Sequence, residues 1–355
     1  MALKFSYVHL PQYPLDYSIE TIQLADRLGY WAFYCVDETW HKDAWLLFAA
    51  AADKTSNIRM GPNVTHVILR DPALIVQALG TLDELTNGRT ECVLSFGNLS
   101  LLEQHHTEWK GKRPLSRVKE ATQVMRTMLK TGTIEEFDGE FFKYSGLSTA
   151  ARPVQDPFPI KLGAMGGPRS FELAGAEFDG MHHAIGYSRE NYEYVMEHTK
   201  KGAEKAGRNW EELDLGAWVA WITSKDSAAA KEVARIIVAF YIPSMPQSLV
   251  ERHGIEYESL QPLLDAFGRG DVAGAVELCT PELAEKLSIA GTPEECAEKV
   301  QRDILPTGIN HIIACITDPH LVKVFTGQDV GGVPDAKGQL QLIHDEVFPL
   351  LGVAV

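Results

Sequence analysis

The chain has 355 residues, of which 45% are hydrophobic and 23% are charged, a composition typical of globular proteins and unlike that of disordered or collagen-like chains. Acidic residues outnumber Lys and Arg by 48 to 33, and the formal net charge is −15. This charge argues against a broad basic surface, so we expect neither nucleic-acid binding nor attachment to an anionic membrane. An anionic ligand would have to be held by local groups.

The five cysteines form no C-x-x-C pair. The sequence therefore indicates neither a disulfide framework nor a thiolate zinc site, and this is typical of a reducing compartment. The first ten residues lack the long apolar run of a signal peptide. Because no apolar stretch approaches the ~20 residues that a membrane helix needs, we predict a cytoplasmic protein without membrane insertion.

Predicted strands and helices alternate along the chain. The predicted strands cover residues 4–9, 31–36, 58–64, 90–96, 160–164, 180–185, 213–223 and 310–316. The predicted helices cover residues 17–28, 44–55, 72–85, 115–130, 168–176, 189–206 and 227–242, followed by one that begins at Pro293 and one over 338–350. Strand–helix units of about thirty residues imply parallel strands joined by right-handed crossovers.

Eight strand–helix units match an α/β fold of the (β/α)8 barrel (TIM barrel) type, whose usual size of ~250 residues leaves room here for insertions. We predict one domain over residues 1–355, with a hairpin insertion near 133–145, around Asp138-Gly139, and a strand-free helical insertion near 243–291. The alternative is a doubly wound open sheet. Neither G-x-G-x-x-G nor G-x-x-x-x-G-K-[ST], the usual phosphate-binding signatures of such sheets, occurs in the chain.

In a barrel the working groups lie at the carboxyl ends of the strands. Two acids, Asp37 and Glu38, follow the second strand; either could transfer a proton if burial raises its pKa, or Asp37 could cap a turn while Glu38 faces solvent. The turn at Gly166-Gly167 precedes a helix. It could hold a phosphate on free backbone N–H groups, or it could be an ordinary tight turn.

Two histidine pairs, His105-His106 and His182-His183, raise the question of a metal site. Neither pair has an H-E-x-x-H frame or a carboxylate at ligand spacing, so we predict no metal. Because neighbouring residues of a strand face opposite sides, at most one of His182 and His183 faces the barrel interior.

Several motifs resemble those of the luciferase-like superfamily. They are V-D at 36–37, R-M-G-P-N-V-T at 59–65, P-A-L at 72–74, L-D-E-L-T-N-G-R at 82–89 and F-D-G-E-F-F at 137–142. A second, more discriminating group resembles the methylenetetrahydromethanopterin reductases that use the deazaflavin coenzyme F420. Its members are A-R-I-I-V-A-F at 234–240, V-E-R-H-G at 250–254 and S-I-A-G-T at 288–292.

The resemblance implies a barrel with the deazaflavin across its carboxyl-terminal face and hydride exchange between C5 of the deazaflavin and a substrate carbon. Asp37 matches an acid that the family keeps after the second strand, and Asn63-Val64 matches a non-prolyl cis peptide that supports the coenzyme ring. Gly166 and Gly167 match the loop that receives the phosphate-bearing tail. The remaining residues that we assign to coenzyme binding are Thr65, Gly97 and Asn98.

The chain departs from those reductases at positions that concern the substrate. They carry a glutamate in the first strand and an aspartate after the fourth, where this chain has Val8 and Ser100, and many relatives read Asp-His where it reads Asp37-Glu38. We therefore expect a ketone, secondary alcohol, imine or activated alkene in place of a methanopterin. The residues that we expect to line its pocket are His9, Trp40, His41, Trp45 and His66.

The sequence thus predicts an F420-dependent oxidoreductase that acts on a small or lipid-like molecule, with Glu38 or Asp37 as the proton donor. One alternative is an FMN-dependent monooxygenase or reductase on the same barrel. A second is a coenzyme-binding subunit without catalysis, which the acids missing at Val8 and Ser100 would explain. Because relatives form dimers or tetramers, we expect a homodimer or a homotetramer.

Overall fold

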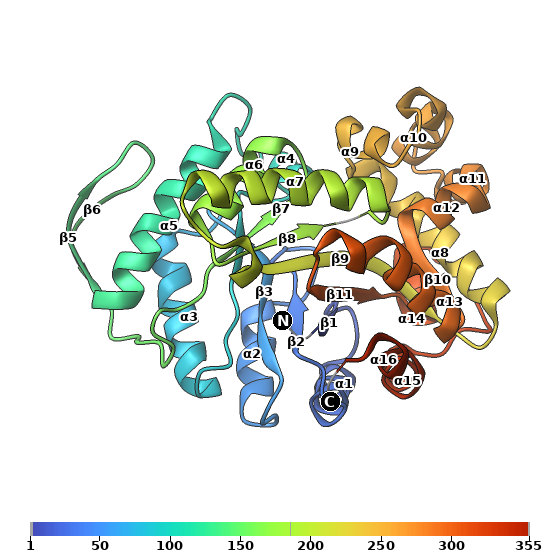
Figure 1. Ribbon diagram of the computed structural model, residues 1–355, viewed down its shortest axis with the longest axis horizontal. Helices are drawn as coiled ribbons and strands as arrows, with labels where there is room; N and C mark the ends of the chain where they lie inside the picture. The colour runs from blue at the N-terminus through green and yellow to red at the C-terminus, as the bar shows by residue number, and fades with distance from the viewer. Residues whose placement is uncertain (1–2, 185, 354–355) are drawn as a thin grey trace.

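The computed structural model describes residues 3–184 and 186–353 (Figure 1). In this part of the chain nine parallel strands form one sheet, and eight of them close into a barrel because β11 pairs with β1 and β8 pairs with β9. The barrel strands are β1 (Lys4–Val8), β2 (Ala32–Cys35), β3 (Arg59–His66), β4 (Val93–Ser95), β7 (Lys161–Ala164), β8 (Gly180–Ala184), β9 (Asp214–Thr223) and β11 (His311–Ile316).

These are the eight strands predicted from the sequence, so the predicted barrel is confirmed and the open-sheet alternative is wrong. Ile185, the last residue predicted for the sixth strand, lies outside the described residues. The strands are buried on both faces, as the alternating side chains of β1 show. Phe5 and Tyr7 pack outward against the helices, whereas Val8 belongs to an apolar cluster inside the barrel.

Helices surround the barrel, and their ends follow local signals. Asp71 accepts a hydrogen bond from the N–H of Ala73, and Pro72 occupies the first turn of α3, which ends at Asn87 in the left-handed conformation. The helices outside the insertions are α1 (Leu15–Arg27), α2 (Ala44–Ala52), α3 (Pro72–Thr86), α4 (Leu99–Gln104), α5 (Pro114–Thr131), α6 (Pro168–Glu177), α7 (Arg189–Lys205), α8 (Ser227–Tyr241), α13 (Pro293–Lys299), α14 (Pro319–Thr326), α15 (Ala336–Leu342) and α16 (Phe348–Leu351).

Shorter turns complete the connections. The 3-10 turns are η1 (Trp210–Glu212), η2 (Ile242–Ser244), η3 (Tyr257–Leu260) and η5 (Leu305–Thr307), and the π-helical turns are η4 (Val300–Ile304) and η6 (Ile343–Val347). No helix within the described residues is long and apolar enough to cross a membrane.

The hairpin insertion is longer than predicted. Strands β5 (Thr133–Asp138) and β6 (Lys143–Ser148) pair antiparallel, with Asp138 opposite Lys143. The turn therefore spans residues 139–142, so the hairpin is not centred on Asp138-Gly139 as predicted. The physical reason is Glu120 of α5, whose carboxylate accepts the N–H groups of residues 140, 141 and 142 and so holds a wider turn.

The helical insertion contains α9 (Gln247–Arg252), α10 (Gln261–Gly268), α11 (Val272–Leu278) and α12 (Pro281–Leu287), which share an apolar core with α8. It lies at the opposite end of the molecule from the hairpin (Figure 1). The prediction that residues 243–291 contain no strand is wrong at their end. There β10 (Ser288–Gly291) pairs with the last four residues of β9, which extend beyond the pairing with β8.

Candidate active site

Asp37 follows β2 and is held by donors from three directions. Its Oδ2 accepts hydrogen bonds from Thr65 Oγ1 at 2.7 Å, Trp45 Nε1 at 3.0 Å and Arg70 Nε at 3.1 Å, and its Oδ1 accepts one from Arg70 Nη2 at 3.3 Å. These donors occupy both oxygens of the Asp37 carboxylate. Asp37 is therefore placed as an anchor for the end of β3.

Glu38, the next residue, has a different environment. Its Oε1 accepts one hydrogen bond, from Asn98 Nδ2 at 3.1 Å, and its Oε2 lies 3.9 Å from His41 Nε2. Burial raises the pKa of the Glu38 carboxyl, and the neighbouring charge of Asp37 adds to this, whereas the Asn98 hydrogen bond opposes it. Of the two acids, Glu38 is thus the one whose surroundings favour holding a transferable proton.

Three histidines near these acids are kept neutral. Burial lowers the pKa of His9 to about 3 and that of His41 to about 4, and it also lowers the pKa of His66. His66 Nε2 donates to the main-chain oxygen of Asp37 at 3.0 Å, so its Nδ1 carries a lone pair. Within the described residues, His66 Nδ1 and His9 Nε2 are buried without a hydrogen-bond partner.

A buried nitrogen without a hydrogen-bond partner destabilises the folded protein as long as no ligand is bound. Two such atoms, at the carboxyl ends of β1 and β3, are therefore suited to receive a polar group of a ligand. His41 differs, because its Nδ1 accepts from Gln12 Nε2 at 2.7 Å, which leaves the N–H of Nε2 on the side of Glu38.

The Asn63-Val64 peptide bond is cis, as predicted. It lies in β3, where the pairing with β4 shifts register between Asn63 and Thr65. The Asn63 side chain points inward and donates from Nδ2 to His182 Nδ1 at 3.2 Å, while Thr65 binds Asp37. Val64 packs against the interior apolar cluster.

Gly97 and Asn98 form the turn between β4 and α4. Gly97 has a φ of +124°, a conformation that strongly favours glycine, and it lies against the His66 ring. Asn98 Oδ1 accepts the N–H of Ser100 and so caps α4, while its Nδ2 donates to Glu38. Both polar atoms of the Asn98 side chain thus have hydrogen-bond partners within the protein. We interpret Asn98 as a residue that orients the Glu38 carboxyl.

The two predicted tryptophans occupy different places. Trp40 is 41% exposed and donates from its indole N–H to Gln104 of α4 at 2.6 Å. Trp45 donates to Asp37 and lies beneath the Arg70 guanidinium, 5.4 Å from ring centroid to Cζ. Trp45 is therefore part of the Asp37 anchor. Arg70 was missed by the sequence analysis, although a basic residue directly before the Asp71-Pro72 helix start was a usable signal.

The glycine turn after β7 leaves open space. Neither Gly166 nor Gly167 has a positive φ, and a Cβ atom added at either would meet no other atom within 4 Å. Gly167 is the N-cap of α6, and no side chain of the described residues caps that helix. Neither the backbone conformation nor internal packing requires glycine here, so the free space is available to a ligand that approaches the backbone closely.

Beneath the site the barrel interior is filled by a charged network. His182 faces inward and donates from Nε2 to Asp214 Oδ1 at 3.1 Å, which His311 Nδ1 also contacts at 2.8 Å. His183 faces outward and binds the Ala164 carbonyl, as strand alternation predicts. Although burial alone would raise it, the pKa of Asp214 is held well below its usual range by Lys161 and the histidines.

His182, Asp214 and His311 also place their ligand atoms within 4.8 Å of one another, the spacing of a metal site. However, Asp214 Oδ2 is bound by two ammonium groups, Lys161 at 2.9 Å and Lys4 at 2.8 Å. Two positive charges on the same carboxylate oppose a cation. We interpret the group as a hydrogen-bond network, which the sequence analysis missed although Lys161 and Asp214 are charged residues in otherwise apolar strands.

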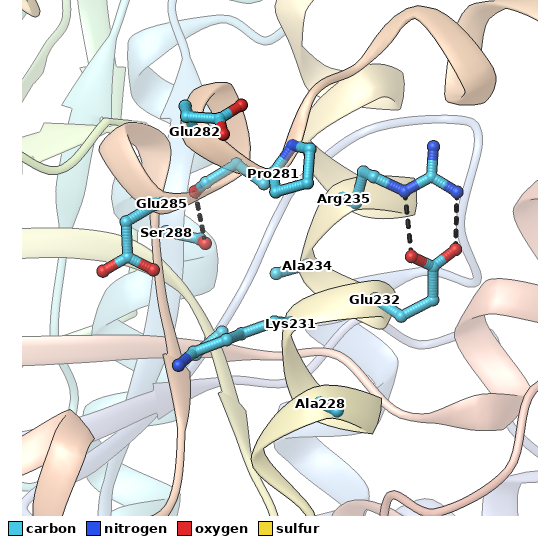
Figure 2. Close-up of a pocket in the computed structure, with 11 residues that line it drawn as sticks. Ala228, Lys231, Glu232, Ala234, Arg235, Pro281, Glu282, Glu285 and Ser288 are labelled. Carbon is cyan, nitrogen blue, oxygen red and sulfur yellow. Dashed lines mark hydrogen bonds and ion pairs between the residues drawn. The ribbon is translucent and has the colours of Figure 1, made fainter.

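A cavity of about 390 Å³ lies elsewhere, between α8, α12 and the start of β10 (Figure 2). Most of its charged side chains are paired: Arg235 with Glu232, Lys231 with Glu295, and Glu285 with Lys299. None of the strand-end residues described above lines it, so we regard it as a surface groove that is separate from the site.

Residues 3–311 match the model of the family described as luciferase-like monooxygenase. The 5,10-methylenetetrahydromethanopterin reductase of Archaeoglobus fulgidus is 29% identical over 356 aligned positions, which cover 98% of this chain and 100% of the relative.

Two solved structures share the fold. One is the coenzyme F420-dependent tetrahydromethanopterin reductase from Methanopyrus kandleri, with a TM-score of 0.87 and 24% identity over 98% of this chain and 99% of the other. The second is an F420-dependent secondary alcohol dehydrogenase in complex with an F420-acetone adduct, with a TM-score of 0.78 and 18% identity over 99% of both chains.

Proposed function

The chain belongs to the luciferase-like monooxygenase family of flavin- and deazaflavin-dependent oxidoreductases, and we propose that it exchanges a hydride between coenzyme F420 and a small or lipid-like organic substrate. The choice of coenzyme is supported by similarity to a reductase over its full length and to two enzymes of known structure that are described as F420-dependent. The observation that carries the proposal is Glu38, a largely buried carboxyl that follows β2 at the carboxyl face of the barrel, accepts a hydrogen bond from Asn98 and has a raised pKa.

The residues at the strand ends fit such a coenzyme. The open backbone at Gly166 and Gly167 suits its phosphate, and the lone pair on His66 Nδ1 suits a polar edge of its ring. The bound deazaflavin would supply or accept the hydride at C5. The chain's own residues would do the remaining work, namely binding, orientation and proton transfer.

Reducing a C=O or C=N bond requires a proton as well as a hydride. Glu38 would donate this proton from its carboxyl, while the Asn98 amide keeps that carboxyl in one orientation. Asp37 would hold the end of β3 through Thr65 and Arg70. In the opposite direction Glu38 would accept the proton from an alcohol or amine.

The substrate is proposed to be a ketone, secondary alcohol, imine or activated alkene. Val8 is buried among apolar residues, and Ser100 contributes its N–H to the Asn98 cap, so neither position offers an acid to a pterin. His9 directly follows Val8, and its buried Nε2 has no hydrogen-bond partner among the described residues. It could therefore bind a polar group of the substrate.

Titration with F420 and with FMN, followed by quenching of coenzyme fluorescence, tests the coenzyme. We expect tight binding of F420. Tight binding of FMN alone would refute the proposal and favour an FMN-dependent monooxygenase or reductase, in agreement with the family's description. Binding of F420 without turnover of carbonyl, imine, alkene or alcohol substrates would favour the non-catalytic subunit.

We also propose that the chain works as a homodimer or homotetramer. Helix α2 has the sequence A-W-L-L-F-A-A-A-A and carries no charge, yet its Leu46 is 72% exposed. A helix that is apolar on all sides is expected to be covered on all sides. A second copy of the chain is the occupant that we expect.

A further inference from the structure

Arg252, at the end of α9 in the helical insertion, holds the glycine turn from one side. Its Nη1 donates to the carbonyl of Gly166 and its Nη2 to the carbonyl of Met165, each at 3.0 Å. Its Nε donates to Asn191 Oδ1 at 3.1 Å, and its Cζ lies 4.8 Å from the centroid of the Tyr194 ring. The guanidinium thus has a fixed orientation between α7 and the turn.

The two hydrogen bonds from Arg252 to the turn carbonyls determine the direction of the N–H groups of the turn. In a trans peptide the C=O and N–H bonds are antiparallel, and both peptides concerned, Met165–Gly166 and Gly166–Gly167, are trans. Because Arg252 binds the two carbonyls, the N–H groups of Gly166 and Gly167 are directed away from it. Neither N–H has a hydrogen-bond partner among the described residues.

The side to which the N–H groups point is suited to an anion. It is the amino-terminal end of α6, a helix of 10 residues whose dipole favours negative charge. The space beside the two glycines is open, since a Cβ atom at either position would meet nothing within 4 Å. The guanidinium charge lies behind the same two peptides.

We propose that Arg252 is a positioning residue that fixes the two N–H groups in the direction needed to bind the phosphate of the coenzyme tail. This inference rests on the proposed function, because it takes the phosphate from that coenzyme. It assigns a role to the helical insertion: through α9 the insertion sets the affinity for the phosphorylated coenzyme without touching the ring.

The test compares F420 with the same deazaflavin that carries its ribityl chain but no phosphate. In Arg252→Gln, we expect the affinity for F420 to fall about 10- to 100-fold, which corresponds to one charge-assisted hydrogen bond, while the affinity for the phosphate-free deazaflavin stays the same. Arg252→Lys should behave similarly, because an ammonium group lacks the planar fork that binds two adjacent carbonyls.

Arg235→Gln is the matched control. Arg235, which pairs with Glu232 (Figure 2), also ties the insertion together by donating to the Val276 carbonyl. Its hydrogen bonds within the described residues go to Glu232, Val276 and Cys279 and not to the glycine turn. This variant should bind both deazaflavins like the wild type. Thermal unfolding of all variants checks that they are folded.

Two outcomes would overturn the inference: equal loss of affinity for both deazaflavins, which indicates a general structural role for Arg252, and unchanged affinity for both. The wild type tests the proposed function separately. If it binds FMN and not F420, the same comparison is made with FMN and riboflavin, and a selective loss of FMN affinity in Arg252→Gln would still support the role of Arg252 toward a phosphate.

Discussion

Replacing Glu38 by Gln removes the proposed proton donor while keeping the shape of the side chain. The amide oxygen of the introduced glutamine can still accept the hydrogen bond from Asn98 Nδ2, so the turn before α4 should keep its conformation. Because Gln cannot transfer a proton, turnover should fall by about 10²- to 10⁴-fold, the usual contribution of general acid catalysis. The affinity for F420 should not change, since the phosphate and ring contacts proposed above do not involve Glu38.

The assay follows oxidation of the reduced deazaflavin by its absorbance, with a carbonyl or imine substrate, over a range of pH. In the wild type, reduction should be fast while Glu38 is protonated and should decline as the pH rises through its raised pKa. The variant should lack this decline. Glu103→Gln, a change of an exposed carboxyl on α4, is the control and should leave turnover and its pH profile unchanged.

The stability of the variant separates lost chemistry from lost structure. Because burial raises the pKa of Glu38 in the folded state, its contribution to stability is complete below the unfolded pKa and is lost as the pH rises through the folded one. Gln has no such loss, so the variant should be at least as stable as the wild type at neutral pH. Normal turnover of Glu38→Gln, together with loss of turnover in Asp37→Asn, would refute the assignment and reverse the two roles.

Three further predictions concern the coenzyme loop, the Asp37 anchor and the apolar helix. Gly166→Ala should unfold at the wild-type temperature but bind F420 more weakly, because its methyl group occupies the open space above the turn; unchanged affinity in a fluorescence titration would contradict this. Asp37→Ala should lose about 1–3 kcal/mol of stability in urea denaturation, because the donors of Thr65, Trp45 and Arg70 lose their acceptor, and an unchanged midpoint would argue against the anchor. Leu46→Glu should convert the oligomer into monomers in analytical ultracentrifugation, and a wild type that is already monomeric would refute the proposed interface.

The sequence predicted the barrel because each strand is a short buried segment between helices with clear ends. The ends of the fourth strand were predicted less accurately: the sequence predicted residues 90–96, whereas β4 is Val93–Ser95. Thr90 makes only an isolated bridge to Met60, and Glu91 turns its carboxylate inward to Lys161 and Arg59. Apolar patterning alone does not reveal where ladder pairing begins.

Short elements escaped prediction for a related reason. The four residues of β10 are too few to show a period, and their strand character depends on the free edge of β9. Helices α4 and α14 are also short, and their clearest signals are single capping residues, Asn98 and Asp318, whose side chains accept the N–H groups of Ser100 and Leu321. Such caps are visible in a sequence only once the preceding strand has been placed.

Contacts between distant segments could not be predicted at all. Arg252 reaches Gly166 across 86 positions of sequence, and the motif that contains Arg252 gave no sign of which loop it would contact. The same holds for Arg70, which meets Asp37 only because α3 begins beside the end of β2. The sequence placed the candidate residues at one face of the barrel, but it did not assign their partners.

The different surroundings of Asp37 and Glu38 follow from the alternation of side chains along a strand. The sequence analysis applied this rule to His182 and His183 but not to the two acids. Alternation along a strand predicted that His182 and His183 face opposite sides, and they do. Asp37 and Glu38 directly follow β2, and the same alternation separates them: Asp37 turns toward Thr65 and Arg70, while Glu38 turns toward Asn98 and His41. Two adjacent acids at the end of a strand thus meet different neighbours: Asp37 is surrounded by hydrogen-bond donors, whereas Glu38 is left with a raised pKa. Their separate roles as anchor and proton donor therefore depend on strand geometry, and inserting one residue after Cys35 should exchange the directions of the two carboxylates.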